Sequence, residues 1–153
     1  MVPQILTDNG DGTRQVPPPP IGNPVDFSTD NGWYIDFPDT STGGNTERAN
    51  VDAQLVQGVL LVPTIVPSNT VCHPGGYGWL NYFGYDTGYI SGVGSLKYDS
   101  PIVGFNTIYI KGNPVLGVVT SAQPTPNAPL KTPKFSDFSS GTFKNRRWLL
   151  REL

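Results

Sequence analysis

The chain is poor in charged residues and in strong helix formers. Asp, Glu, Lys and Arg make up 14% of its 153 residues, against roughly 25% in typical soluble domains. It contains one Met and two Glu, whereas Gly and Pro number 18 and 16. Thr, Asn, Val, Tyr and Phe outweigh the helix formers and favour strands. The composition therefore predicts a turn-rich, all-β protein of ordinary domain size.

Long apolar runs and targeting signals are also missing. No stretch of about 18 consecutive apolar residues occurs, so the sequence predicts no membrane span. The opening MVPQILTDNGDG lacks both the basic start and the apolar core of a secretion signal. Secretion of this chain would have to be directed by a signal outside it.

The net charge of -2 hides an asymmetry along the chain. Residues 131–153 have a net charge of +4, because they contain six basic residues and only two acidic ones, Asp137 and Glu152. Residues 1–130 have a net charge of -6. A basic tail can bind nucleic acid or anionic lipid. Here Trp148 and three leucines interrupt the charges, which favours a terminal strand with a solvated rim. We therefore expect no nucleic-acid partner.

Cys72 is the single cysteine, so no disulfide can form within the chain. Its neighbour His73 invites a metal site, but adjacent residues of an extended backbone point apart, and metal sites need three or four ligands. No other His or Cys is present. We therefore expect no metal here. Two states of Cys72 remain possible. It is either a free buried thiol, or one half of a disulfide whose other cysteine lies on another sequence.

Turn signals divide the chain into short segments. The stretch DNGDG, Asp8–Gly12, is typical of a hairpin turn, since Asn-Gly and Asp-Gly supply positive φ angles. A calcium site is the alternative there, but an EF-type loop needs oxygen ligands at alternate positions and a Glu at the twelfth. Two Pro-rich stretches, residues 17–24 and 123–133, are predicted to be extended connectors.

Short apolar stretches between these signals predict strands. Seven or eight strands and no helix are expected in total. Pro63 lies inside a nearly unbroken apolar run, where it indicates a bulge or an edge. Beside the strand described next, the main strands are expected at Trp33–Phe37, Val51–Val56, Val59–Val66, Thr107–Ile110, Val115–Thr120 and the C-terminal RRWLLREL.

The stretch HPGGYGWLNYFGYDTG, residues 73–88, contains a strand that is apolar on both faces. Trp79, Phe83 and Tyr85 point one way, and Leu80 and Tyr82 point the other. A strand with one face in water alternates apolar and polar residues, whereas a strand covered on both sides need not. Both faces of this strand are therefore expected to be buried against other parts of the protein.

A β-propeller provides such cover, because its blades stack face against face around a central axis. An aromatic-rich strand that runs into Asp86-Thr87-Gly88 is similar to a recurring pattern in quinoprotein-like propellers. At about 40 to 50 residues per blade, the chain would hold about three blades, fewer than the roughly four needed to close a ring. The expected fold class is all-β, with antiparallel sheets as part of a quinoprotein-like β-propeller. A small β-sandwich is the alternative.

Residues suited to catalysis are scarce. Catalysis needs a base, a nucleophile or a metal with neighbours that tune it. The one His adjoins Cys72, and no glycine-rich phosphate loop follows a strand. Asp36, Asp52 and Asp86 are interpreted as strand-end and turn residues. We predict that the chain is not an enzyme and has no catalytic, cofactor-binding or metal site residue. A fragment of a quinoprotein-type propeller enzyme is the alternative.

Three segments contain sequence motifs that point to a particular protein family and not only to a fold. They are GNPVDFSTDNGWYIDFP (Gly22–Pro38), ERANVDAQLVQGVLLVPTIVPSNTVCHPGGYGWLNYFGYDTG (Glu47–Gly88) and RRWLLREL (Arg146–Leu153). In order, spacing and residue type they resemble the C-terminal propeller domain of PilY1-type tip adhesins of bacterial type IV pili. That family has Asn-Pro-Val-Asp-Trp before Gly-Trp-Tyr-x-Asp-Leu-Pro, then a hairpin ending in Ile-Pro-Ser, then Cys-x-x-Gly-Gly before a Trp-Leu strand. One departure is Phe27, which stands where the family has Trp.

The resemblance implies a function and a location. Residues 1–153 would be the C-terminal part of a propeller in a non-catalytic pilus-tip adhesin or assembly protein, which supports pilus biogenesis and surface attachment. The implied location is extracellular, at the pilus tip on the bacterial cell surface. The implied partners are the remainder of the parent propeller, pilin or minor pilin subunits, and a host or abiotic surface. The family's Asp-x-Asp-x-Asp-Gly calcium loop is absent from this sequence, so no cofactor is expected in this segment, and calcium only elsewhere in a full-length parent.

Overall fold

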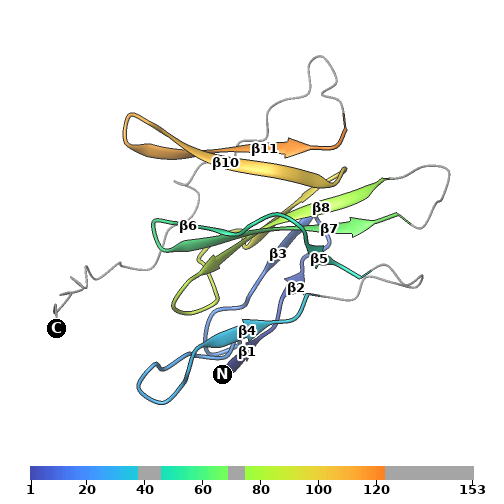
Figure 1. Ribbon diagram of the computed structural model, residues 1–153. Coiled ribbons are helices and arrows are strands. Elements are labelled where there is room, and N and C mark those ends of the chain that lie inside the picture. Colours follow the sequence, from blue (N-terminus) through green and yellow to red (C-terminus); the bar gives the residue numbers. More distant parts are fainter. Residues whose placement is uncertain (38–45, 69–74, 123–153) are drawn as a thin grey trace.

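The computed structural model describes residues 1–37, 46–68 and 75–122 of the chain (Figure 1). These residues form eleven β-strands, and the described part contains no helix. The strands are grouped in three sheets that lie in layers, and the sheets do not close on themselves. The expectation of an all-β protein with antiparallel sheets is confirmed.

The middle layer is a seven-stranded sheet. Its strands are β2 (Thr7–Asp8), β3 (Thr13–Gln15), β5 (Arg48–Ala49), β6 (Gln54–Val56), β7 (Val59–Pro67), β8 (Gly76–Gly84) and β9 (Ser95–Tyr98). The order is β2-β3-β9-β8-β7-β5, and β6 also pairs with β7. Every pair in this sheet is antiparallel. The chain therefore runs through β6, β7, β8 and β9 as a consecutive meander.

A two-stranded sheet covers each face of the middle sheet (Figure 1). On one side, β1 (Val2–Gln4) and β4 (Trp33–Ile35) pair in parallel. On the other side, β10 (Ile102–Ile110) and β11 (Asn113–Thr120) form an antiparallel hairpin. The middle sheet is thus enclosed between two thinner layers.

Two-residue turns close the β6–β7 and β10–β11 hairpins. Gln57 and Gly58, with φ of 49° and 78°, join β6 to β7. Lys111 and Gly112, with φ of 51° and 82°, join β10 to β11. Positive φ at both positions is the type I′ geometry whose twist matches that of the flanking strands. The strands predicted at Val51–Val56 and Val59–Val66 are thus joined as a hairpin, and Asn113 and Pro114, which were expected to lie between two strands, belong to β11.

Pro63 lies inside β7, at a point where the strands on one side of β7 change. Pairing with β8 is unbroken, and Pro63 stands opposite Leu80. On the other side, β6 pairs with residues 59–61 and β5 pairs with residues 64–65. Neither β5 nor β6 pairs with Pro63. Because proline has no N–H to donate, this missing pairing leaves no Pro63 amide without a hydrogen-bond acceptor. The predicted edge is confirmed on this side, and the β8 side has no bulge.

The structure contains more strands than the sequence predicted. The estimate of seven or eight is wrong, because eleven strands occur among the described residues and strands such as β1 and β9 were not expected, whereas β4 lies within the strand predicted at Trp33–Phe37. The strand predicted to begin at Thr107 instead begins at Ile102, and Val51 lies outside β6. These strands depend on partners distant in sequence, such as β8 for β9, so their local residue pattern is weak.

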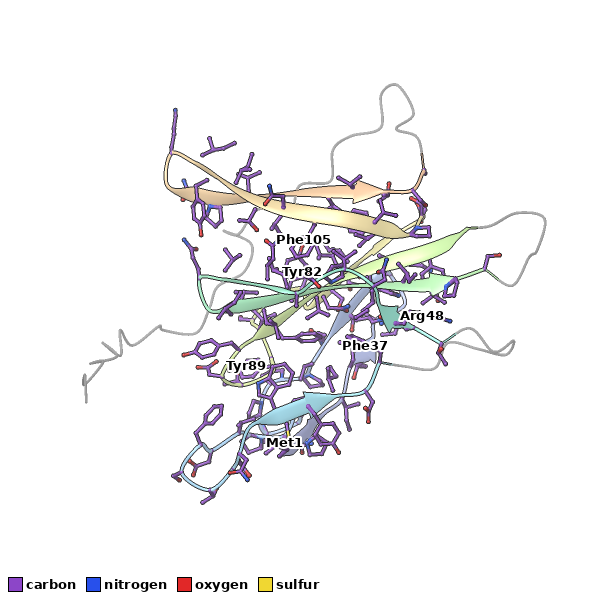
Figure 2. All side chains as sticks on the ribbon, in the orientation of Figure 1. Met1, Phe37, Arg48, Tyr82, Tyr89 and Phe105 are labelled. Carbon is purple, nitrogen blue, oxygen red and sulfur yellow. The ribbon has the colours of Figure 1, made fainter. Side chains whose placement is uncertain are left out.

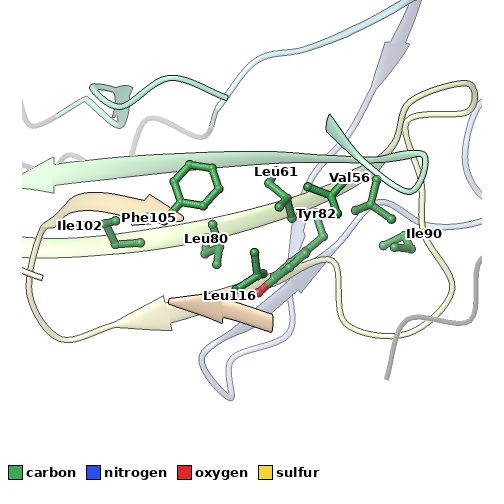
Figure 3. Close-up of a cluster of buried hydrophobic side chains, with 9 residues drawn as sticks. Val56, Leu61, Leu80, Tyr82, Ile90, Ile102, Phe105 and Leu116 are labelled. Carbon is green, nitrogen blue, oxygen red and sulfur yellow. The ribbon is translucent and has the colours of Figure 1, made fainter. Parts of the chain in front are cut away.

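β8 is buried on both faces, as its sequence predicted, but the expected burial of Tyr85 is wrong, because β8 ends at Gly84 and Tyr85 is 46% exposed. Trp79, Leu80, Tyr82 and Phe83 are each at most 2% exposed. Leu80 and Tyr82 belong to the larger core cluster, which fills the space between the middle sheet and the β10–β11 hairpin (Figure 3). Phe83 belongs to the second cluster, with Leu6 and partly buried residues of β4. Burial also raises the pKa of the Tyr82 phenol well above its usual value.

Glycine fixes two close approaches around β8. At Gly78, a Cβ atom would lie 2.9 Å from Cγ1 of Ile102, so the hairpin strand β10 packs directly on the β8 backbone. After β8, Gly88 has a φ of 76° and its amide donates to the carbonyl of Gly84 at 2.7 Å. The Asp86-Thr87-Gly88 segment is therefore a turn that ends in a left-handed glycine.

Candidate functional site

A strip of buried polar side chains crosses one face of the middle sheet. All of its members are less than about one tenth exposed although they are polar or charged. They come from five different strands or strand ends and lie on the face that points to β1 and β4. The members are Ser95 of β9, Asn81 of β8, Thr64 of β7, Glu47 beside β5 and Arg14 of β3.

Hydrogen bonds connect the strip from one end to the other. Ser95 Oγ donates to Asn81 Oδ1 at 2.7 Å, and Asn81 Nδ2 donates to Thr64 Oγ1 at 3.2 Å. Thr64 Oγ1 in turn donates to Glu47 Oε1. Arg14 Nη1 donates to Glu47 Oε2 at 2.7 Å, within an ion pair whose side chains are 2% and 0% exposed. The strip is therefore a continuous network in a site without access to solvent.

Trp79 provides the apolar side of this network. The guanidinium carbon of Arg14 lies 3.6 Å from the centroid of the Trp79 ring, which is a close cation–π stack. The Lys97 ammonium lies over the same ring at 5.9 Å and over Tyr77 at 4.2 Å. Arg14 Nε and Trp79 Nε1 have no hydrogen-bond partner among the described residues. Stacking on the ring thus stabilises a cation that only one carboxylate neutralises.

The chemistry of the strip is structural. Each hydrogen bond joins side chains from different strands, so the network fixes how β3, β5, β7, β8 and β9 lie against one another. Buried polar networks of this kind favour one arrangement of strands, because any other leaves their groups unpaired. The sequence did not predict the pairing of Arg14 with Glu47. The pair spans 33 positions, and the available signal was the scarcity of Glu, which occurs twice in the chain.

The carboxylates considered in the sequence lie apart from this strip. Asp36 directly follows β4, Asp52 lies between β5 and β6, and Asp86 lies in the turn after β8. All three are exposed. Their interpretation as strand-end and turn residues is confirmed.

The Asp8–Gly12 segment forms the predicted hairpin turn between β2 and β3. Asp8 Oδ1 accepts a hydrogen bond from the Gly10 amide at 2.9 Å, and Asp11 Oδ1 accepts one from the Thr13 amide at 2.9 Å. The Thr13 hydroxyl also donates to Asp11, and this bond lowers the pKa of the Asp11 carboxyl. One oxygen of each carboxylate therefore holds the loop closed.

Some predicted features lie outside the described residues. They are Cys72 with His73, the connector at 123–133 and the terminal strand that contains Trp148. Within ranges 1–37, 46–68 and 75–122, no group of three or more His, Cys, Asp or Glu side chains is placed to hold a metal ion.

Several large apolar side chains are exposed on the two thin layers, whose side chains are drawn in Figure 2. The outward residues of the hairpin include Ile108, Ile110 and Val119, which are each more than half exposed. On the opposite side of the molecule, the exposed residues near β1 and β4 include Ile5 and Tyr34. Contiguous exposed apolar surface is typical of interaction sites. These two outer faces are the candidate binding surfaces of the chain.

In the part of the chain that the structure describes, no helix has the length and apolar character needed to cross a membrane. No known protein family, no curated protein and no solved structure matches this chain.

Proposed function

We propose that this chain is a non-catalytic part of a type IV pilus tip-associated adhesin or assembly protein, built as a piece of a β-propeller. The observation that carries the propeller part is a middle sheet with other sheets packed on both of its faces, as in stacked blades. The sequence signatures in Gly22–Pro38 and Glu47–Gly88 support the assignment to a pilus tip.

The strand order supports the same proposal. β6, β7, β8 and β9 are neighbours both in sequence and in the sheet, and a four-stranded antiparallel sheet is the unit of a propeller blade. The β10–β11 hairpin then corresponds to part of an adjacent blade, whereas the β1–β4 pair covers the other face but is parallel, unlike the strands of a blade. In a two-layer sandwich, by contrast, each sheet has one covered and one solvated face.

The remainder of the parent propeller is the partner that best fits the outer faces. A neighbouring blade would present an apolar sheet, and the outward residues Ile108, Ile110 and Val119 already alternate along the hairpin as a stacked sheet requires. Contacts with pilin subunits and with a host or abiotic surface would then use other parts of the assembled parent.

The exposed outer faces predict association of the isolated chain. We expect its average mass to rise with concentration in size-exclusion chromatography with light scattering, because apolar patches beyond a few hundred Å² are rare on monomers. Replacement of Ile108 and Ile110 by Glu is expected to reduce this association, whereas replacement of Leu55, exposed on the middle sheet, is the control. A compact monomer of 16.5 kDa at every concentration, with cooperative unfolding, would contradict the propeller fragment and favour a small closed sandwich.

The assignment to a pilus tip is tested on cells that produce the chain. Gold-labelled antibodies against it are expected to bind at the ends of pili in electron micrographs of unpermeabilised cells. Label confined to the cell interior would contradict the proposal. An absorbance spectrum of the purified parent protein distinguishes the alternative enzyme, because a bound quinone cofactor absorbs in the near ultraviolet and visible range.

A further inference from the structure

β11 has one edge that no described strand occupies. The pair of Ile110 and Asn113 next to the turn is hydrogen-bonded, and hydrogen-bonded pairs alternate with non-bonded ones along an antiparallel hairpin. Leu116 and Val118 belong to the non-bonded pairs, so their N–H and C=O groups point away from β10. Among the described residues, these groups have no backbone hydrogen-bond partner.

The β10 edge of the same hairpin is covered by side chains. Asn50 Nδ2 donates to the Ile102 carbonyl at 3.3 Å, and Gln54 Nε2 donates to the Phe105 carbonyl at 3.4 Å. The Thr107 hydroxyl donates to Gln54 Oε1 at 3.1 Å. The hairpin therefore has one covered edge and one open edge. Association through a single edge closes as a pair of copies, whereas two open edges would allow a growing sheet.

The residues of β11 do nothing to protect the open edge. Proteins usually blunt exposed edges with Lys, inward charges, proline or bulges, because an open edge pairs with other chains. β11 carries no charged residue, and its one proline, Pro114, lies next to the turn. The remaining length, VLGVVT, is rich in β-branched residues. Such an edge is a template for another strand.

A second copy of β11 matches this edge. In an antiparallel register centred on Val118, this residue lies opposite Val118 of the second copy, and Leu116 lies opposite Thr120. The Thr120 backbone also points outward, because the next residue, Ser121, donates its amide to the Pro101 carbonyl on the β10 side. All outward N–H and C=O groups from Leu116 to Thr120 then have partners.

Side chains and charges also fit this register. Gly117 lies opposite Val119 of the second copy, so a residue without a side chain faces a β-branched one. Lys111 is the one charged residue of the hairpin, residues 102–120. The two Lys111 residues would lie roughly 45 Å apart along the sheet, well beyond the Debye length of about 8 Å. The edge is therefore complementary to itself.

We propose that two copies of this chain pair through the outer edges of β11, about a two-fold axis at Val118. The two hairpins then form a four-stranded antiparallel sheet. Two short paired strands bury far less than the roughly 800 Å² per partner of a stable interface, so this dimer is weak and forms at high protein concentration. The pairing does not depend on the pilus assignment.

Amide hydrogen exchange of the isolated chain, followed by NMR at increasing concentration, tests the pairing. The amides of Leu116 and Val118 become hydrogen-bonded only in the dimer. Because exchange proceeds from the open form, we expect it to slow by about tenfold at these two amides once about nine tenths of the chains are paired. The amides of Val115 and Gly117 already bond to β10 and serve as internal references.

Three results would overturn the proposal. Constant exchange at Leu116 and Val118 while the average mass rises would mean that the chains associate through their apolar outer faces alone. Slow exchange at these amides at the lowest concentration would mean that the edge is covered within one chain. A monomer at millimolar concentration would mean that the edges do not pair.

Val118→Pro provides a second measurement. It removes an outward amide but no hydrogen bond of the hairpin. Because the two-fold axis passes through this position, the dimer loses two hydrogen bonds, and we expect its dissociation constant in analytical ultracentrifugation to rise at least about tenfold. Val118→Ala, which shortens the side chain and keeps the amide, is the control and should have a much smaller effect. Equal dissociation constants for these two variants would contradict the pairing.

A pair of lysine variants leaves the backbone intact. Val119→Lys places like charges near the two-fold axis, where they oppose pairing, and we expect a several-fold weaker dimer that high salt partly restores. Val103→Lys, on β10, is the matched control, since Val119 and Val103 are 59% and 52% exposed. It should leave the edge dimer intact. Equal weakening by the two lysines would assign the contact to the outer face of the hairpin and overturn the edge pairing.

Discussion

Replacement of Trp79 by alanine is expected to lower the free energy of unfolding by about 3 to 5 kcal/mol, as truncation of a large buried aromatic does. Trp79 is 2% exposed and lies on β8, which pairs with β7 along its full length. Its loss would leave a cavity between the sheets. It would also remove the ring on which the Arg14 guanidinium stacks at 3.6 Å. Urea denaturation followed by tryptophan fluorescence measures the change, because Trp33 and Trp148 remain as probes.

Trp148→Ala is the matched comparison for this substitution. Trp148 lies near a charged terminus in the sequence, whereas Trp79 lies in a central strand that is covered on both faces. Replacement of Trp148 is therefore expected to cost clearly less than that of Trp79. Small and equal effects at both positions would mean that the core does not lie around β8.

The sequence predicted those parts of the fold that local residue patterns determine. Gln57-Gly58 and Lys111-Gly112 are turns because both residues adopt positive φ, which a chain signals with Gly and few other residues. The double-faced burial of β8 was predicted because its residues alternate between two apolar sets. In each case the signal lies within about ten residues, where single-sequence reasoning is effective.

Parts of the fold that depend on distant partners were not predicted. β9, with the sequence SLKY, is a strand because β8 and β3 supply partners on its two sides. β1 pairs with β4 through only three residue pairs, across the Pro-rich connector. Neither β9 nor β1 has a residue pattern that distinguishes it from a loop, whereas β4 lies within the strand predicted at Trp33–Phe37. The layered arrangement arises from these pairings. The sequence therefore indicated that both faces of β8 are buried, but not which strands pack against them.

The buried strip shows the same limit at the level of single side chains. Thr64 and Asn81 sit in strands that were predicted, yet nothing local distinguishes them from exposed polar residues of an alternating strand. Their burial follows from the β1–β4 layer, which covers this face of the middle sheet. Once that face is closed, each polar group needs a partner, and the network from Ser95 to Arg14 provides it.

The ion pair at the end of the strip predicts the second large effect. Glu47→Ala would leave the Arg14 guanidinium buried, at 2% exposure, without a carboxylate, and would remove the acceptor of the Thr64 hydroxyl. Loss of one partner from a buried pair costs about 3 to 5 kcal/mol, because the remaining charge is desolvated without compensation. Replacement of both residues at once, Arg14→Met with Glu47→Leu, is expected to recover most of this loss, since apolar residues of similar volume often substitute for a buried pair. Arg48→Ala, an exposed arginine on β5, is the control and should change stability by no more than about 0.5 kcal/mol. Urea denaturation of the four proteins gives the free energies. A cost below about 1 kcal/mol for Glu47→Ala is the value typical of exposed pairs, and it would show that water reaches this pair and that the middle sheet is not closed on the β1–β4 side.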